Sequence, residues 1–147
     1  MPGRTETPGV SACTALRLRK AARRVSLIYD RHLEPHGLSI TQFGLLAQVE
    51  RLDGIGIGEL AEKLVMDPTT VTRNLRPLQR RELVAFAADP NDKRARRLHL
   101  TAEGRAALKG AKPGWSKAQR EVEAALGDAD TAVLHATLDR ALAKLSA

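Results

Sequence analysis

Hydrophobic positions along this chain recur mainly at helical spacing. Between residues 13 and 32 the apolar side chains fall three or four positions apart, with arginines and a lysine between them. Pro35 ends this predicted helix. A second helix is predicted from Ser39 to about Leu52, because Ser39 and Gln42 have the spacing of a capping box.

A glycine-rich stretch, residues 53–58, breaks the second helix. It predicts a turn with one short strand, since it lacks the Lys-Ser/Thr pair and the preceding strand of a phosphate-binding loop. A third helix is predicted from Glu59 to Val65. Asp67 followed by Pro68 then marks a sharp helix start, because an acidic cap and a first-turn proline both favour one.

The fourth predicted helix has one apolar stripe, Val71, Leu75 and Leu78, and one face of hydroxyls and arginines. Arginine can bind guanine through two hydrogen bonds, threonine can contact a base edge, and helix N-termini favour phosphate. The composition therefore favours a DNA-reading helix over a merely solvated one. Pro77 removes a backbone hydrogen bond, so a kink or an early end is expected there. The outward-facing residues are Thr69, Thr70, Thr72, Arg73 and Arg76.

Two short stretches, residues 83–88 and 96–101, have the composition of strands, and the turn-forming sequence DPND lies between them. They predict a β-hairpin that packs on the helices, because an isolated hairpin is marginally stable. A tip with this much positive charge fits a DNA groove or a phosphate backbone. The basic residues at the predicted tip are Lys93, Arg94, Arg96 and Arg97.

Two stretches with apolar side chains at helical spacing follow the hairpin. Thr101 is expected to cap the first, Pro113 and Gly114 to interrupt and bend it, and Gly127 to separate it from the last helix. Too few aromatic residues and too little chain remain to bury both ends within one protomer. The two ends therefore predict a helical dimer interface.

Composition and charge narrow the function classes. The chain has 147 residues, enough for one domain. Hydrophobic residues make up 43% of it and aromatic residues only 3%, so the core must be built from aliphatic side chains, which favours helices. The net charge is +7, with basic regions at 1–38 and 67–105 and an acidic region at 39–66, which suggests a polyanionic partner. No apolar run reaches bilayer length and no secretory h-region is present, so a soluble, cytoplasmic protein without a membrane partner is expected.

Catalytic and metal chemistry have no visible basis in the sequence. We find no nucleophile with a base partner, no carboxylate pair and no cofactor fingerprint, so neither an enzyme nor a cofactor is predicted. The one cysteine, Cys13, excludes an intrachain disulfide. His32 and His36 are four apart, but Pro35 breaks the helix that would align them, so no metal is predicted.

The segments GLSITQFGLLAQV, ELAEKLVMDPTTVTRNLRPLQRRELV and DPNDKRARRLHLTAEGR resemble the MarR family of winged helix-turn-helix transcriptional regulators over about residues 13–145. The hairpin is the most specific part, with Asp92, Arg94, Thr101 and Gly104 at the family's Asp-x-Arg…Leu-Thr-x-x-Gly positions. In that family Arg94 would enter the minor groove, with Asp92 orienting it. Three positions depart from the pattern: Glu82 and Val65 stand where the family often has glycine, and Pro77 occurs in some members and not in others.

The resemblance implies a mainly α fold with a small β-hairpin wing and with N- and C-terminal dimerisation helices. Residues 1–11 would be a disordered arm and 12–147 a single domain. Within that domain, 39–101 would form the winged helix-turn-helix core, and 13–36 and 102–146 the dimerisation helices. The residues expected to contact DNA are Thr69, Thr70, Thr72, Arg73, Arg76, Asp92, Lys93, Arg94 and Arg96.

The implied function is a sequence-specific transcriptional regulator, a repressor released by a small-molecule effector, that binds a pseudo-palindromic operator as a homodimer. The effector pocket would include Tyr29, His32, Phe43 and Trp115, for which core packing is the alternative role. Two other functions stay open. One is a redox-sensing regulator acting through Cys13, and the other is a structural helical dimer without operator specificity.

Overall fold

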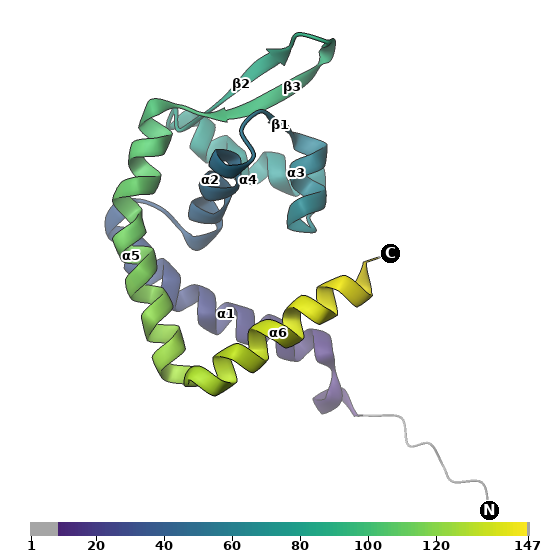
Figure 1. The fold of residues 1–147 in the computed structure, drawn as a ribbon, viewed down its shortest axis with the longest axis vertical. Helices are drawn as coiled ribbons and strands as arrows, with labels where there is room; N and C mark the ends of the chain where they lie inside the picture. The colour runs from purple at the N-terminus through teal and green to yellow at the C-terminus, as the bar shows by residue number, and fades with distance from the viewer. Residues whose placement is uncertain (1–8, 147) are drawn as a thin grey trace, which may run out of the picture.

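The computed structural model describes residues 9–146, which form a set of helices and one small sheet (Figure 1). The chain forms an open curve, with the sheet and the shorter helices at one end and the N-terminal and C-terminal helices at the other. In chain order the elements are η1 (Val10–Ala12), α1 (Thr14–Leu33), η2 (Glu34–His36), α2 (Ile40–Arg51), β1 (Ile55–Gly56), α3 (Ile57–Leu64), α4 (Pro68–Arg80), β2 (Val84–Asp89), β3 (Asp92–Leu100), α5 (Ala102–Leu126) and α6 (Asp128–Leu145).

The N-terminal region differs in part from the expected disordered arm. Residues 1–8 of that arm lie outside the described residues, whereas Val10–Ala12 form a 3-10 turn. The first eleven residues of α1, 14–24, are all exposed, and its buried side chains, Tyr29 and Leu33, lie in the last two turns. Only the C-terminal part of α1 therefore packs into the core of the protomer.

The start of α2 is fixed by the predicted capping box. The Ser39 Oγ accepts a hydrogen bond from the Gln42 amide at 3.1 Å, and the Gln42 side chain accepts one from the Ser39 amide at 3.1 Å. Two backbone donors at the helix end are thereby satisfied. The short strand predicted after α2 is present as β1, and α3 begins at Ile57, two residues before the expected Glu59.

The Asp67 cap of α4 is also confirmed, since its carboxylate accepts a hydrogen bond from the Thr69 amide at 2.8 Å. Of the two outcomes expected at Pro77, the early end is wrong, because α4 continues to Arg80, and the kink stays a prediction. Proline at this position removes one helical hydrogen bond, but Leu75 and Leu78 on either side of it are fully buried. Packing of that apolar stripe keeps the last turn helical.

Two non-glycine residues have left-handed backbone conformations. Val65 ends α3 with φ of 52°, and Glu82 precedes β2 with φ of 58°. These are the two positions where the sequence departs from the glycine usual in the family. A side chain at such an angle costs free energy, most of all a β-branched one. The chain therefore adopts left-handed turns at Val65 and Glu82 at some cost in stability.

The sheet is antiparallel and has the strand order β1-β3-β2. β1 pairs with β3 through Ile55↔Leu98 and Gly56↔Arg97, and β2 pairs with β3 from Val84↔Leu100 to the tip. Leu98 and Leu100 are buried, so the base of the hairpin is part of the core. The far end of β2 and β3 projects from the molecule as a two-stranded ribbon (Figure 1), which confirms the predicted wing.

Pro113 and Gly114 do not interrupt α5, which is one helix from Ala102 to Leu126, whereas the expected bend agrees with the course of the helix (Figure 1). It follows an arc down one side of the molecule (Figure 1). Gly114 is buried against α1: a Cβ there would lie 2.6 Å from the His32 carbonyl oxygen. The glycine thus allows a close approach of two helices, and packing against α1 supports α5 through its proline.

The core is built mainly from leucine, valine and alanine, with Tyr29 and Phe43 as its buried aromatic residues. Apolar side chains also remain exposed on α1 and α6, among them Leu18, Val133 and Leu142. None of the helices within residues 9–146 is long and apolar enough to span a membrane.

Candidate DNA interface

The exposed face of α4 carries one stripe of polar side chains. Thr69, Arg73 and Arg76 are exposed at positions i, i+4 and i+7, on the side opposite the buried stripe that starts at Val71. Thr70 and Thr72 are partly buried beside it, and the Thr72 hydroxyl donates to the Pro68 carbonyl at 3.0 Å. The structure therefore places all five predicted residues at or near one accessible face.

A tight turn sets the position of α4 relative to α3. The Met66 amide donates to the Ala61 carbonyl at 2.9 Å and the Val65 amide to Glu62 at 3.1 Å, which closes the end of α3. Asp67 then opens α4 at once. Pro68 has no amide hydrogen and the Thr69 amide is bound by the Asp67 carboxylate, so the cap already satisfies the donors in the first two positions of α4.

Two aspartates shape the tip of the wing. The Asp89 carboxylate accepts a hydrogen bond from the Asn91 amide at 2.9 Å, and the Asp92 carboxylate accepts one from the Arg94 amide at 3.0 Å. Asp92 contacts the backbone amide of Arg94 and not its side chain, so the guanidinium group of Arg94 is not held by this carboxylate. Asp92 therefore fixes the backbone at Arg94, and its role in orienting the Arg94 side chain toward DNA stays a prediction.

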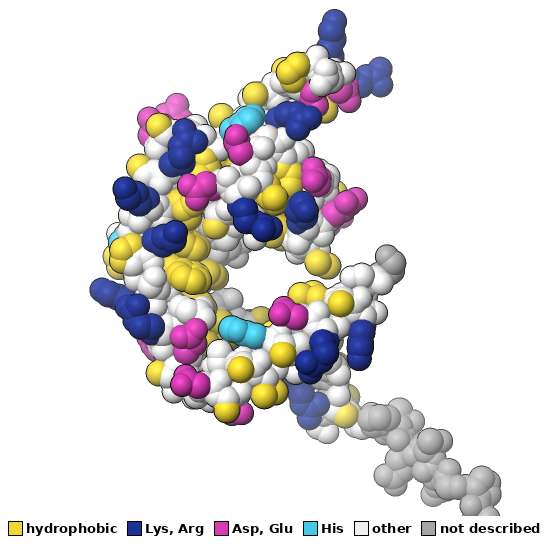
Figure 2. Space-filling view, in the orientation of Figure 1, with side chains coloured by type: hydrophobic (Ala, Val, Ile, Leu, Met, Phe, Trp, Pro, Cys, Tyr) yellow, Lys and Arg dark blue, Asp and Glu magenta, His cyan; other side chains and the backbone are white. Residues whose placement is uncertain are grey.

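Positive charge gathers at this tip. Lys93, Arg94 and Arg96 are exposed, and none of them takes part in an ion pair with another described residue. Figure 2 shows dark blue side chains at the far end of the hairpin, away from the rest of the molecule. Arg97, which the sequence places with these residues, instead pairs with Asp89 at 3.1 Å and lies at the base of the wing.

The base of the wing is joined to both α4 and α5. The Thr101 hydroxyl donates to the Glu82 carbonyl at 2.6 Å and accepts from the Gly104 amide at 2.9 Å, so one side chain caps α5 and holds the turn after α4. Gly104 lies so close to Leu83 that a Cβ there would be 1.9 Å from the Leu83 carbonyl oxygen. These contacts explain why threonine and glycine stand at these two positions.

The four residues predicted to line an effector pocket have separate surroundings. Phe43 and Trp115 stack on each other, with ring centroids 6.1 Å apart. The His32 Nε2 lies 2.6 Å from the Glu121 carboxylate, which also pairs with Arg31. Tyr29 donates a hydrogen bond to Gln119, and burial, with the Glu123 carboxylate adding to it, raises the pKa of the Tyr29 hydroxyl.

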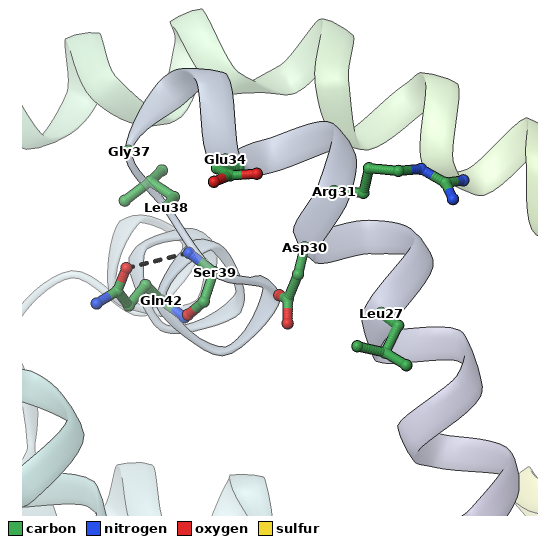
Figure 3. A pocket seen from close by; sticks show the side chains of 8 residues that line it. All are labelled: Leu27, Asp30, Arg31, Glu34, Gly37, Leu38, Ser39 and Gln42. Carbon is green, nitrogen blue, oxygen red and sulfur yellow. Dashed lines mark hydrogen bonds between the residues drawn. The ribbon is translucent and has the colours of Figure 1, made fainter.

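Two cavities lie near these residues. The first, of about 370 Å³, is mainly apolar and lies between α1, α5 and α6, where Tyr29 forms part of its wall. The second, of about 550 Å³, is an open pocket between the end of α1 and the start of α2. Figure 3 shows Asp30 of α1 facing Ser39, while Arg31 points away from the pocket.

Cys13 is an exposed free thiol at the residue before α1. Redox sensing through it stays a prediction. His36 lies against Gly114 rather than beside a second ligand, and the described residues contain no group of three or more His, Cys, Asp or Glu placed to bind a metal.

A helix-turn-helix formed by α3 and α4, followed by a projecting β-hairpin with a basic tip, defines a winged helix-turn-helix protein. Residues 38–95 match the family model described as MarR family. The M. tuberculosis transcriptional regulator MosR, in a crystal structure with DNA, is 40% identical, with a TM-score of 0.72 over 88% of this chain and 98% of that one.

Two further comparisons agree. A point mutant of E. coli MarR, crystallised with operator DNA, shares the fold, with a TM-score of 0.80, 23% identity, and coverage of 87% of this chain and 92% of that one. The HTH-type transcriptional regulator YsmB of Bacillus subtilis is 31% identical over 91 residues, which are 59% of this chain. That match spans 62% of the length of YsmB. The chain belongs to the MarR family of transcriptional regulators.

Proposed function

We propose that this chain is a homodimeric, sequence-specific DNA-binding regulator that acts as a repressor and is released by a small molecule. The observation that carries the proposal is the pairing of two unneutralised basic surfaces. One is the stripe of Thr69, Arg73 and Arg76 on α4, and the other is the wing tip with Arg94. A helix and a wing with these side chains suit a major groove and the minor groove beside it.

The likeness to MosR supports DNA as the partner, since that protein is 40% identical and has been crystallised with DNA. In the proposed complex Arg73 and Arg76 contact base edges, and Lys93, Arg94 and Arg96 contact the flanking minor groove and its phosphates. Asp92 positions Arg94 through its backbone. Thr69, Thr70 and Thr72 lie in the first two turns of α4, beside the arginines of that helix.

The exposed apolar side chains of α1 and α6 support a dimer formed by residues 13–36 and 102–146. Leu18 on α1 and Leu134 on α6 line the same apolar cavity and are both exposed in the protomer. Leu142 and Leu145, at the end of α6, are 57% and 79% exposed. A second copy would cover these groups, and its two-fold symmetry would match a pseudo-palindromic operator.

An effector would act at the end of the molecule where α1, α5 and α6 meet. The cavity beside Tyr29 has the volume of a small-molecule site and lies among the helices proposed to dimerise. Of the four residues predicted for an effector site, Tyr29 lines this cavity, whereas His32, Phe43 and Trp115 are not among its lining residues, so the proposed site is the cavity beside Tyr29. A ligand that changed the packing of α1 against α5 would change the spacing of the two α4 helices.

The proposal is tested by DNA binding. Genomic fragments captured by the protein are compared with scrambled fragments over a range of salt concentrations. We expect preferred binding to the captured fragment, with a steep salt dependence because bound phosphates release counterions. Arg73→Ala should weaken binding by about 1–3 kcal/mol and reduce the preference for the captured sequence.

The matched control is Arg120→Ala, which removes the same charge from an exposed position on α5. It should bind nearly as the wild type does. Weak binding without sequence preference, or equal losses in the Arg73 and Arg120 variants, would contradict the proposal.

A further inference from the structure

The wing leaves the core of the protein at Arg97. On β3, Arg97 pairs with Gly56 of β1 on one side and with Ala87 of β2 on the other. Beyond it, toward the tip, the described sheet has two strands instead of three. Because a two-stranded ribbon is only marginally stable in water, the direction of the wing depends on what restrains the chain around Arg97.

The Arg97 side chain joins the core to the far end of β2. Arg97 alternates along β3 with the buried Leu98, so it projects from the face of the sheet opposite the core. Its Nη1 donates to the carbonyl oxygen of Gly54, in the turn before β1, at 2.8 Å. Its Nη2 lies 3.1 Å from the Asp89 Oδ2, at the end of β2. One planar guanidinium group therefore makes both contacts.

Asp89 extends this connection to the tip of the wing. Its Oδ1 accepts a hydrogen bond from the Asn91 amide, while its Oδ2 is the atom that faces Arg97. The amide of Asn91, and then the charge of Arg97, hold the pKa of Asp89 below its usual range. The carboxylate is thus ionised at neutral pH, and the tip turn is linked through Asp89 and Arg97 to Gly54.

The turn that receives Arg97 is itself firmly placed. Gly54 has φ of 82°, which favours glycine, and its amide donates to the Leu98 carbonyl at 3.0 Å. The carboxylate of Asp53, next to Gly54, lies 2.7 Å from the Nδ1 atom of His99. His99 is two residues after Arg97 and therefore lies on the same face of β3. Two side chains of β3, Arg97 and His99, therefore contact one turn of the core.

We propose that Arg97 is a positioning residue for DNA binding: by joining Gly54 to Asp89 it fixes the direction of the wing and so presents Arg94 to the minor groove. The inference rests on the proposed function, since it takes the wing to enter DNA. It assigns Arg97 and Asp89 a role different from that of the basic residues at the tip, which contact DNA themselves.

The rival explanation is that Arg97 contacts DNA directly, since its side chain is 47% exposed. The two explanations predict opposite effects of a change at Asp89 on the affinity for DNA. Asp89→Asn removes a negative charge, so electrostatics alone predicts tighter DNA binding. If Asp89 acts by holding Arg97, the same change weakens binding, because an amide nitrogen would face the guanidinium group while the amide oxygen still accepts from Asn91.

The first measurement compares the affinity of Asp89→Asn for the captured DNA fragment with that of Glu50→Gln. The control removes the same charge from an exposed position on α2. We expect Asp89→Asn to bind about tenfold more weakly, which is the size of one lost contact, and Glu50→Gln not to weaken binding. Unchanged or tighter binding by Asp89→Asn overturns the proposal.

A double-mutant cycle asks whether Arg97 acts through Arg94. If it does, Arg94→Ala with Arg97→Gln binds as weakly as Arg94→Ala alone, because the wing contact is already lost. Additive losses mean that Arg97 contacts DNA independently, and they overturn the proposal. If Arg94→Ala alone binds like the wild type, the proposed wing contact fails and this inference fails with it. A weakened Arg94→Ala beside a tightly binding Asp89→Asn overturns the inference alone.

Hydrogen exchange in the absence of DNA gives a second test. Asp89→Asn and Arg97→Gln should both speed the exchange of amides between residues 87 and 96, while the amides of α2 and α4 exchange as in the wild type. Arg97→Lys keeps the charge but cannot form both contacts, so it should resemble Arg97→Gln. Wild-type exchange in the wing of these variants would overturn the proposal.

Discussion

The contact between Gly104 and Leu83 makes a sharp prediction about stability. A Cβ on Gly104 would lie 1.9 Å from the Leu83 carbonyl oxygen and 2.9 Å from its carbonyl carbon, and real Cβ atoms essentially never come within 3.0 Å of another heavy atom. In Gly104→Ala the start of α5 and the start of β2 must therefore separate by about 1 Å. The Leu83 carbonyl also accepts from the Thr101 amide at 3.1 Å, so this bond would be strained or lost.

The expected cost follows from these contacts. A strained core contact of this kind costs about 1–3 kcal/mol, and the bonds of Thr101 to Leu83 and Glu82 contribute about 1 kcal/mol each. Alanine returns about 1 kcal/mol through its higher helix propensity. Gly104→Ala should therefore lower the free energy of unfolding by about 3 kcal/mol.

The matched control is Gly110→Ala in the same helix. Gly110 is exposed, and a Cβ there would have no neighbour within 4 Å, so this variant should be more stable than the wild type by about 0.5–1 kcal/mol. Both free energies come from urea unfolding followed by circular dichroism, at one protein concentration because dimerisation would add to stability. A Gly104→Ala variant within 1 kcal/mol of the wild type would refute the close approach of α5 to β2.

Three further predictions concern local structure. Val65→Gly and Glu82→Gly should each stabilise the protein by about 0.5–1 kcal/mol in urea unfolding, because glycine relieves the left-handed backbone and this gain exceeds its cost in unfolded-state entropy; a loss of stability in either variant would argue against the left-handed turn there. Asp67→Ala should cost about 1 kcal/mol through loss of the α4 cap, and a neutral effect would contradict that role. Hydrogen bonds from Arg31 and then from His32, both on α1, lower the pKa of the Glu121 carboxyl group. The ionised carboxylate therefore stabilises the folded state at neutral pH, and this stabilisation is lost as the pH falls through the lowered pKa. Unfolding measured from pH 7 to pH 3 should therefore show a steeper loss for the wild type than for Glu121→Gln, and parallel profiles would exclude the effect.

Local signals in the sequence were sufficient for most helix starts and for the wing. Ser39 with Gln42 and Asp67 with Pro68 are caps whose partners lie within three residues, so the spacing alone predicts the contact. The stripe of Val71, through Leu75 to Leu78, follows helical periodicity and is buried as predicted.

The errors arose where contacts between distant elements outweigh local preference. Pro77 and Pro113 oppose helical geometry, yet α4 and α5 continue through them because the flanking residues pack against other elements. The sequence predicts that Gly114, with Pro113, interrupts and bends a helix, whereas its close approach to the His32 carbonyl makes it a packing residue within one helix. No local signal reports the approach of α1 to α5.

The candidate site shows the same division. The residues at the wing tip and on α4 were predicted from composition and from the family pattern, and the structure places them on accessible surfaces. The role proposed for Arg97 could not be predicted from the sequence, because its hydrogen bond to Gly54 joins residues 43 positions apart and depends on the register of β3 with β1. In the sequence Arg97 is one more arginine beside the tip.

The most direct test of the account is a footprint of the captured DNA fragment with the wild type and with Arg94→Ala. We expect two protected half-sites about one helical turn apart, each flanked by a protected stretch of minor groove, as a symmetric pair of α4 helices and wings requires. Arg94→Ala should lose the flanking protection and keep the central half-sites. A single unpaired footprint, or flanking protection that persists without the Arg94 side chain, would contradict the account.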